Sequence, residues 1–159
     1  MGMNIRRVVT GHDAQGRSIV EIDEHPRNVV SSRPETSSCV LWTTEGFPVD
    51  NDGFSDSSGK PIGKTITDGT VFRVVRYEPG GQPRMHRTDS IDYAVVLSGR
   101  VEMILDEGRV ILQAGDLVVQ RGTMHGWYNP GPETCEIAFI LVSATPVTAG
   151  GRTLHAQGG

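Results

Sequence analysis

The chain has 159 residues, of which 36% are apolar, which is enough for the core of one domain and short for two. Its net charge of −4, with no basic run, argues against a nucleic-acid partner, and no apolar stretch approaches the ~20 residues that cross a membrane. The 20 glycines and 9 prolines favour many turns between short strands over long helices.

The first residues lack the hydrophobic stretch of a secretory signal, and the two cysteines, Cys39 and Cys135, stand far apart in the sequence. Isolated cysteines of this kind match neither a paired metal site nor a disulfide framework. We therefore expect a cytoplasmic protein in which both cysteines are reduced thiols packed as small apolar side chains.

Residues 1–46 are predicted to form an N-terminal arm with short strands. β-like runs at residues 6–9 and 18–22 flank a turn signal, and a third run lies at residues 38–43. The glycines, prolines and aspartates of residues 47–69 then predict a long loop. A loop of this length in a compact domain is functional or mobile.

Residues 70–145 are predicted to form the body of a single all-β domain. About seven β-like runs recur there at a spacing of roughly 8–12 residues, which suggests a sandwich or barrel. These runs are residues 71–77, 93–97, 101–105, 109–112, 117–119, 127–128 and 137–142. No segment shows a sustained helical repeat. Residues 146–159 are expected to form a frayed tail.

Two groups of residues in the body share a distinctive spacing. They are Gly80, His86, Thr88, Asp92 and Gly99, followed by Gly115, Gln120, Gly122, His125 and Asn129. This spacing resembles the two signature motifs of the cupins, in which a glycine precedes His-x-His, a glutamate and a glycine, and a second glycine precedes Pro-x-Gly, a histidine and an asparagine. The resemblance covers about half of the chain. It implies a double-stranded β-helix, the jelly-roll barrel of small cupins.

The chain departs from the cupin pattern at its metal ligands. In a typical cupin, both histidines of the first motif, its glutamate and the histidine of the second motif bind a divalent metal. Here His86 and His125 keep two of these positions, Thr88 replaces the second histidine and Asp92 replaces the glutamate. Gln120 stands at the usual proline, and the second motif is one residue shorter before its glycine.

Three short segments resemble a narrower group of small single-domain cupins from bacteria and fungi, some of them found alongside natural-product pathways. The segments are Met85-His86-Arg87-Thr88, Asp92-Tyr93 and Gln120-Arg121-Gly122-Thr123. The resemblance suggests that the threonine and aspartate substitutions are characteristic of this group. It implies no single reaction.

The catalytic residues are predicted to be His86, His125 and Asp92. Two histidines and a carboxylate are also the ligand set of non-heme iron enzymes, so these three residues would bind one divalent metal (Fe, Mn, Ni or Zn) if the site holds one. Against a metal, aspartate is shorter than glutamate by about one C–C bond, ~1.5 Å, and Asp92 would fall short of bonding distance unless the strand shifts or a water bridges. Without a cofactor, the same residues form an acid–base site.

Substrate contacts are predicted from five further residues. Thr88 shares a strand face with His86, and Trp127 shares one with His125, so both would line the pocket together with Gln120. Arg84 and Arg87 flank His86 and would suit a substrate carboxylate or enolate through a bidentate contact. Each has an alternative reading: the arginines as surface charges, Trp127 as core and Thr88 as an ordinary strand residue.

The combined reading is a small enzyme acting on a small oxygenated metabolite, carbonyl- or carboxylate-bearing and polyketide-like. Lyase-, isomerase- or cyclase-type acid–base chemistry is favoured. One alternative is an Fe(II)-type dioxygenase using the two histidines and the carboxylate. Another is a ligand-binding or sensor protein without catalysis.

A homodimer through the N-terminal arm is also expected. The resemblance implies a dimer that exchanges strands, and closed two-fold dimers are the commonest assembly. The run Val40-Leu41-Trp42 is the predicted contact segment. The alternative is that this run packs on its own barrel.

Overall fold

The computed structural model describes residues 3–158, which form strands, turns and loops and contain no helix that could cross a membrane. The strands are β1 (Arg7–His12), β2 (Ser18–Glu24), β3 (Val29–Arg33), β4 (Thr36–Glu45), β5 (Gly69–Tyr77), β6 (His86–Arg87), β7 (Ser90–Ser98), β8 (Arg100–Leu105), β9 (Arg109–Gln113), β10 (Leu117–Arg121), β11 (His125–Tyr128), β12 (Cys135–Ser143), β13 (Val147–Ala149), β14 (Arg152–Leu154) and β15 (Gln157–Gly158). The prediction of an all-β fold is confirmed.

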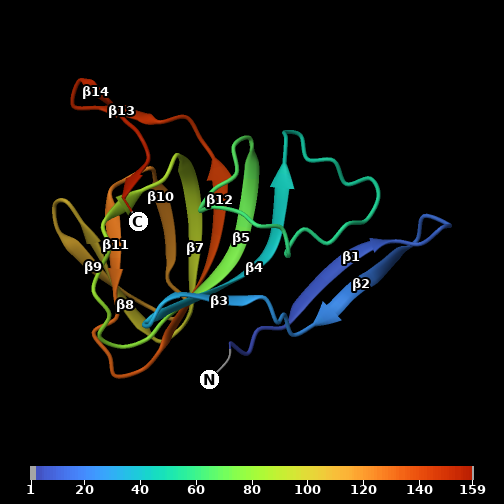
Figure 1. Ribbon diagram of the computed structural model, residues 1–159, viewed down its shortest axis with the longest axis horizontal. Coiled ribbons are helices and arrows are strands. Elements are labelled where there is room, and N and C mark those ends of the chain that lie inside the picture. Colours follow the sequence, from blue (N-terminus) through green and yellow to red (C-terminus); the bar gives the residue numbers. More distant parts are fainter. Residues whose placement is uncertain (1–2, 159) are drawn as a thin grey trace.

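Two sheets face each other and form the barrel (Figure 1). The larger has the order β10-β7-β12-β5-β4-β3, and the smaller has the order β15-β6-β11-β8-β9. All paired strands are antiparallel. Strand order does not follow the sequence, as expected when a jelly roll alternates between two sheets.

Alternation along β7 separates the two faces of the larger sheet. Asp92, Ala94 and Val96 are buried, whereas Tyr93 and Leu97 are 45% and 48% exposed. This alternation follows from the two-residue period of a strand. The strand therefore delivers a carboxylate, Asp92, to the interior of the barrel.

The main core lies between the two sheets. Its buried apolar side chains come from both of them and include Val71, Val96, Val101, Trp127, Ile137 and Phe139. A second cluster of Cys39, Leu41, Val74 and Ala138 lies on the other face of the larger sheet, under Met3 and Ile5. Both cysteines are buried free thiols, as predicted.

The N-terminal arm is shorter than predicted. Strands β3 and β4 belong to the larger sheet, where β4 pairs with β5, so a boundary at residue 46 does not separate arm from barrel. Only the hairpin of β1 and β2 stands apart (Figure 1). Arg7 fastens it, because its guanidinium donates to the carbonyl of Leu41 (3.0 Å) and to both carboxylate oxygens of Asp56 (2.9 and 2.8 Å).

The run Val40-Leu41-Trp42, which is predicted to form the dimer contact, packs at least partly within its own chain. Leu41 is 7% exposed in the second apolar cluster. The ring of Trp42 packs against Phe54 of the long loop, with 6.3 Å between ring centroids.

The C-terminal segment is ordered rather than frayed. Strands β13 and β14 form a hairpin, and β15 pairs with β6, which places Gly158 opposite His86. The sequence analysis missed β6 because two residues carry no recognisable period. The loop predicted at residues 47–69 is present between β4 and β5.

Candidate active site

A cavity of about 180 Å³ lies inside the barrel, between the two sheets. Six of the eight predicted site residues line it: His86, Thr88, Asp92, Gln120, His125 and Trp127. Three larger hollows lie elsewhere on the molecule, and neither histidine lines any of them. Residues of both sequence motifs therefore line the same cavity, as their strand positions indicated.

Arg84 and Arg87 do not line this cavity. The Nε atom of Arg87 donates to the carbonyl of Gly122 at 3.1 Å, and its side chain borders a neighbouring hollow. Arg84 contributes its backbone carbonyl to the site, 2.9 Å from the Nδ1 atom of His86. The predicted cationic contact to substrate is therefore not placed on these two arginines.

The two histidines face each other across paired strands. β6 and β11 pair with His86 opposite His125, and the ring centroids are 4.2 Å apart. Nδ1 of His86 lies 2.9 Å from the Arg84 carbonyl, and Nδ1 of His125 lies 2.9 Å from the Thr123 carbonyl. A carbonyl only accepts hydrogen bonds, so each Nδ1 carries the proton and each Nε2 presents a lone pair.

Burial keeps both imidazoles neutral. It lowers the pKa of His125 to about 4, against the opposing effect of the hydrogen bond to Thr123. Burial also lowers the pKa of His86, which the bond to Arg84 partly offsets. At neutral pH both rings are therefore proton acceptors rather than donors.

A chain of hydrogen bonds joins Thr88, Ser90, Asp92, Gln120 and His125. The Thr88 and Ser90 hydroxyls lie 2.8 Å apart, and Ser90 donates to Oδ1 of Asp92 at 2.6 Å. The amide nitrogen of Gln120 donates to Oδ2 of Asp92 at 2.8 Å and lies 3.1 Å from Nε2 of His125. Burial raises the pKa of Asp92, while the bonds from Ser90 and Gln120 lower it. Gln120 thus bridges the carboxylate and one imidazole.

Because of this bridge, the Nε2 atoms of the two histidines differ in their hydrogen bonding. Nε2 of His125 already accepts a hydrogen from Gln120. Nε2 of His86 has no protein partner among residues 3–158, and His86 is the less buried ring. Of the two imidazoles, His86 is therefore the one with a free lone pair, and Oε1 of Gln120 is a second acceptor of the site without a partner.

The predicted ligand set does not fit a metal in this arrangement. Each oxygen of Asp92 accepts a hydrogen bond, and the amide of Gln120 lies between Asp92 and His125. Within the described chain, no group of three His, Cys, Asp or Glu side chains is placed to hold a metal ion. A metal would have to displace the amide before it could reach the carboxylate.

The sequence analysis missed several residues of the cavity wall, among them Lys64, Arg73, Tyr77 and Phe139. Arg73 could have been predicted, because it lies two residues from the inward-facing Val71 of the same strand and therefore shares its face. Lys64 could not have been predicted, because it belongs to the long loop, where no strand period indicates the direction of a side chain.

Relatives of known name resemble nearly the whole chain. The phomopsin biosynthesis cluster protein C' of Diaporthe leptostromiformis is 36% identical over 157 residues, covering 93% of this chain and 83% of that protein. The cupin-domain-containing oxidoreductase fogC of Aspergillus ruber is 32% identical over 159 residues, covering 94% of this chain and 77% of that protein.

Solved structures show the same fold at low identity. KdgF from a Halomonas species has a TM-score of 0.52 and 16% identity, over 73% of this chain and 88% of that one. An RmlC-like cupin from Shewanella frigidimarina has a TM-score of 0.50 and 13% identity, over 74% of this chain and 84% of that one. The family model for the cupin domain matches residues 73–142. The chain belongs to the cupin family.

Proposed function

We propose that this cupin is an enzyme that moves protons on a small oxygenated metabolite, with Nε2 of His86 as the general base. The observation that carries the proposal is the free lone pair of His86 in the cavity, on a ring that burial keeps neutral. A positioned base whose pKa lies below the working pH is in its active form at neutral pH.

The residues define a simple sequence of events. His86 removes a proton from the carbon next to a carbonyl, and the electron pair of the broken C–H bond moves to the carbonyl oxygen. In isomerisation, the enolate reforms its carbonyl while a conjugated carbon takes the proton back from the ring. In elimination, the enolate reforms its carbonyl, a C=C bond forms as the C–O bond at the β-carbon breaks, and the departing oxygen takes the proton. Trp127 and Phe139, 5.5 Å apart between ring centroids, form an apolar wall that excludes water.

His125 and Asp92 act on this step through position and charge. Asp92 holds the amide of Gln120, and that amide holds His125 with its Nε2 atom as an acceptor. His125 packs against the ring of His86 and, being neutral, adds no charge that would oppose protonation of His86. Membership of biosynthetic clusters, stated in the names of two relatives, supports a substrate from secondary metabolism.

Proton exchange tests the proposal without knowledge of the natural substrate. The protein, treated with EDTA, is incubated in D₂O with small oxo acids and diketones, and loss of the α-proton signal is followed by ¹H NMR. We expect exchange above the buffer background that is unchanged by EDTA. Absence of exchange with every compound would overturn the proposal.

A second candidate function, oxidation, is favoured by the names of relatives such as fogC and virC, which are called oxidoreductases. The same assay separates it from proton transfer. Activity that is lost with EDTA, restored by Fe(II) and accompanied by oxygen uptake would support a dioxygenase. Binding of these compounds without exchange or oxygen uptake would support a ligand-binding or sensor protein.

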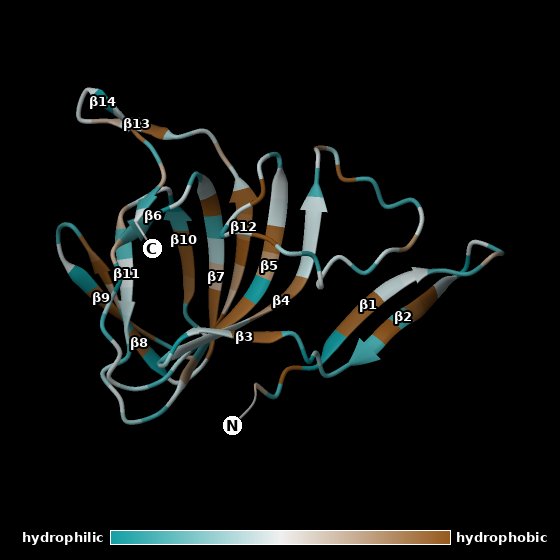
Figure 2. Ribbon diagram, in the orientation of Figure 1, coloured by the Kyte–Doolittle hydropathy of each residue, from teal (hydrophilic) through white to brown (hydrophobic). Residues whose placement is uncertain are grey.

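We also propose that the chain forms a homodimer through the β1–β2 hairpin. The hairpin pairs with no other strand, and its Val8 and Val20 are 50% and 58% exposed. On β10 of the larger sheet, Leu117 is 74% and Val119 is 61% exposed. Most of this strand is coloured as hydrophobic in Figure 2. A lone two-stranded hairpin is marginally stable, so docking on a second copy would stabilise it.

Light scattering tests the dimer. The expected mass is twice the 17.2 kDa of the chain. The double variants V8K/V20K and L117K/V119K should each give the monomer mass, because lysine side chains would be buried at the contact. Val110→Lys, at a position 40% exposed on β9, is the control and should remain dimeric. A monomeric unmodified protein would contradict the proposal.

A further inference from the structure

Arg73 places a charge inside the barrel. It lies on β5 at an inward position and is half-buried at the cavity wall. Its Nη2 atom donates to the backbone carbonyls of Gly63, at 3.4 Å, and Lys64. Its Nε atom is buried without a hydrogen-bond partner. Backbone carbonyls satisfy part of the guanidinium but do not neutralise its charge.

Lys64 adds a second cation to the same wall. Its ammonium donates to the carbonyl of Gly158 at 3.0 Å, again a neutral partner. Burial lowers the pKa of Lys64, and Arg84, Arg73 and Arg33 lower it further. Three arginines thus add positive charge around this ammonium, in a chain whose net charge is −4.

Neither cation forms an ion pair within the described residues, although the charge of Asp92 in the same cavity wall raises the pKa of Arg73. Among the residues that the structure describes, no ion pair involves Arg73 or Lys64. Asp92 is the one carboxylate of the cavity wall, and both of its oxygens are taken by Ser90 and Gln120. Burying the guanidinium of Arg73 without an ion-pair partner is costly, and the more exposed Lys64 adds a second positive charge beside it, so the arrangement favours a negatively charged ligand.

We propose that Arg73 and Lys64 form an anion subsite and that the ligand of this cavity carries a carboxylate. This proposal rests on the proposed function, because His86 as the base defines which part of the ligand reacts. A carboxylate held by these two cations, in a cavity of about 180 Å³, keeps the rest of a small ligand beside His86 and the aromatic wall. The same cations would stabilise the enolate oxygen that forms when a neighbouring carbon loses its proton.

The size and lining of the cavity suggest which small molecules to use in a binding test. Its aromatic side chains, Tyr77, Trp127 and Phe139, suit a flat ring. Benzoate supplies the ring and the carboxylate, and benzamide is its neutral counterpart of the same shape. Binding is measured by NMR titration of the unmodified protein at low salt, following the ring protons of His86 and His125.

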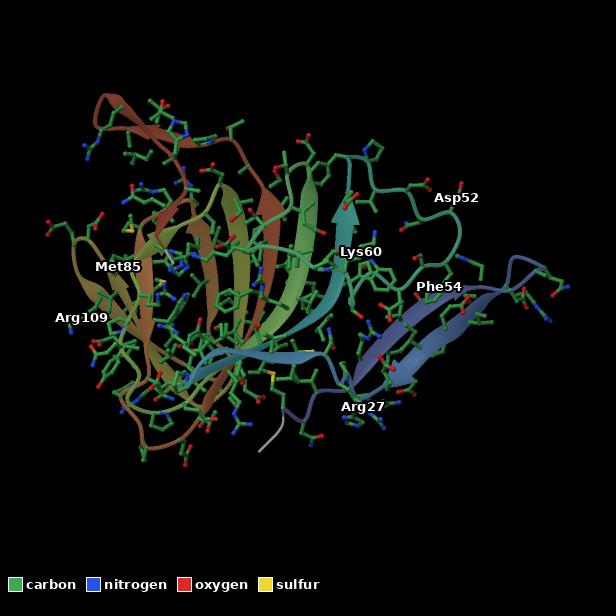
Figure 3. All side chains as sticks on the ribbon, viewed as in Figure 1. Arg27, Asp52, Phe54, Lys60, Met85 and Arg109 are labelled. Carbon is green, nitrogen blue, oxygen red and sulfur yellow. The ribbon has the colours of Figure 1, made fainter. Side chains whose placement is uncertain are left out.

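We expect benzoate to bind at least tenfold more tightly than benzamide. The variants R73Q and K64Q should each weaken benzoate binding at least tenfold and leave benzamide binding unchanged. Lys60→Gln is the matched control, because Lys60 belongs to the same loop but faces a separate groove (Figure 3). R73K preserves the charge and should retain most of the preference for benzoate.

Two results would overturn the subsite. One is equal or absent binding of benzoate and benzamide to the unmodified protein. The other is unchanged benzoate binding in K64Q, which does not alter the barrel and keeps the test valid if R73Q fails to fold. Because binding needs no turnover, benzoate selectivity without α-proton exchange would refute the proposed base while leaving the subsite intact.

Discussion

Replacing His86 with glutamine is expected to lower the rate of α-proton exchange by at least about a hundredfold, within the range that a positioned general base contributes. Glutamine has a similar reach and can still bond to the Arg84 carbonyl, but it cannot accept a proton at neutral pH. The measurement is the ¹H NMR exchange rate in D₂O for the oxo acid that responds best with the unmodified protein.

The pH profile identifies the base independently of the variant. Since burial lowers the pKa of His86, the exchange rate should rise with pH below neutrality and be flat from about pH 7 upward. His155→Gln is the control, since His155 is exposed and outside the cavity, and it should exchange at the unmodified rate. A rate that is unchanged in His86→Gln would remove His86 as the base.

The fold was predictable because its signals are local. Strand runs with a two-residue period and frequent turns predicted the barrel, and the glycines at residues 80, 99, 115 and 122 all adopt the positive φ that their turns require. The sequence could not assign β4 to the barrel, because membership of a sheet depends on a pairing with β5 across the long loop. It also missed β6, which exists through its pairing with β11 and β15.

The candidate site was predictable in its members but not in its bonding. Alternation places His86, Thr88 and Asp92 in one cavity, as the sequence indicates. The position of the Gln120 amide between Asp92 and His125 depends on the register of β10 against β7, which pairs Gln120 with Asp92. That contact decides whether Asp92 is a metal ligand or a hydrogen-bond acceptor, and no motif records it.

The cation that lines the cavity was also not predicted from the sequence. Arg84 and Arg87 were predicted to contact the substrate because they flank His86 in sequence. Arg87 is adjacent to His86 on β6 and so points to the opposite face, whereas Arg84 precedes the strand and reaches the site only through its backbone carbonyl. Arg73, far away in sequence, reaches the cavity through the inward face of β5. Closeness to His86 in the sequence was therefore a poor guide to which cation lines the cavity.

The free energy of unfolding is expected to fall by on the order of 3 kcal/mol as the pH is lowered from about 6.5 to about 4, because of His125 alone. The unfolded chain, with an ordinary histidine pKa, binds a proton first, and the folded state resists it. Stability is therefore complete above about pH 6.5 and is lost as the pH falls. His86 contributes in the same direction, since its pKa is also lowered.

The aspartates do not add to this loss of stability between about pH 6.5 and 4.5. Burial raises the pKa of Asp92, so protonation of Asp92 favours the folded state at low pH and opposes the histidines. The lowered pKa values of Asp13, Asp23 and Asp56 reduce stability only as the pH falls through and below the ordinary aspartate value. Urea unfolding at pH 7.0, 6.0, 5.0 and about 4.5 therefore isolates mainly the histidines.

The decisive comparison is the slope of stability with pH in His125→Gln. Its side chain still fills the site but does not titrate, so the slope between pH 7.0 and about 4.5 should fall by more than half. His25→Gln, at an exposed position, should keep the unmodified slope. An unchanged slope in His125→Gln, or a ring that titrates near about pH 6.5 by NMR, would mean that burial does not lower the pKa of His125 and that this ring is not the source of the pH dependence of stability.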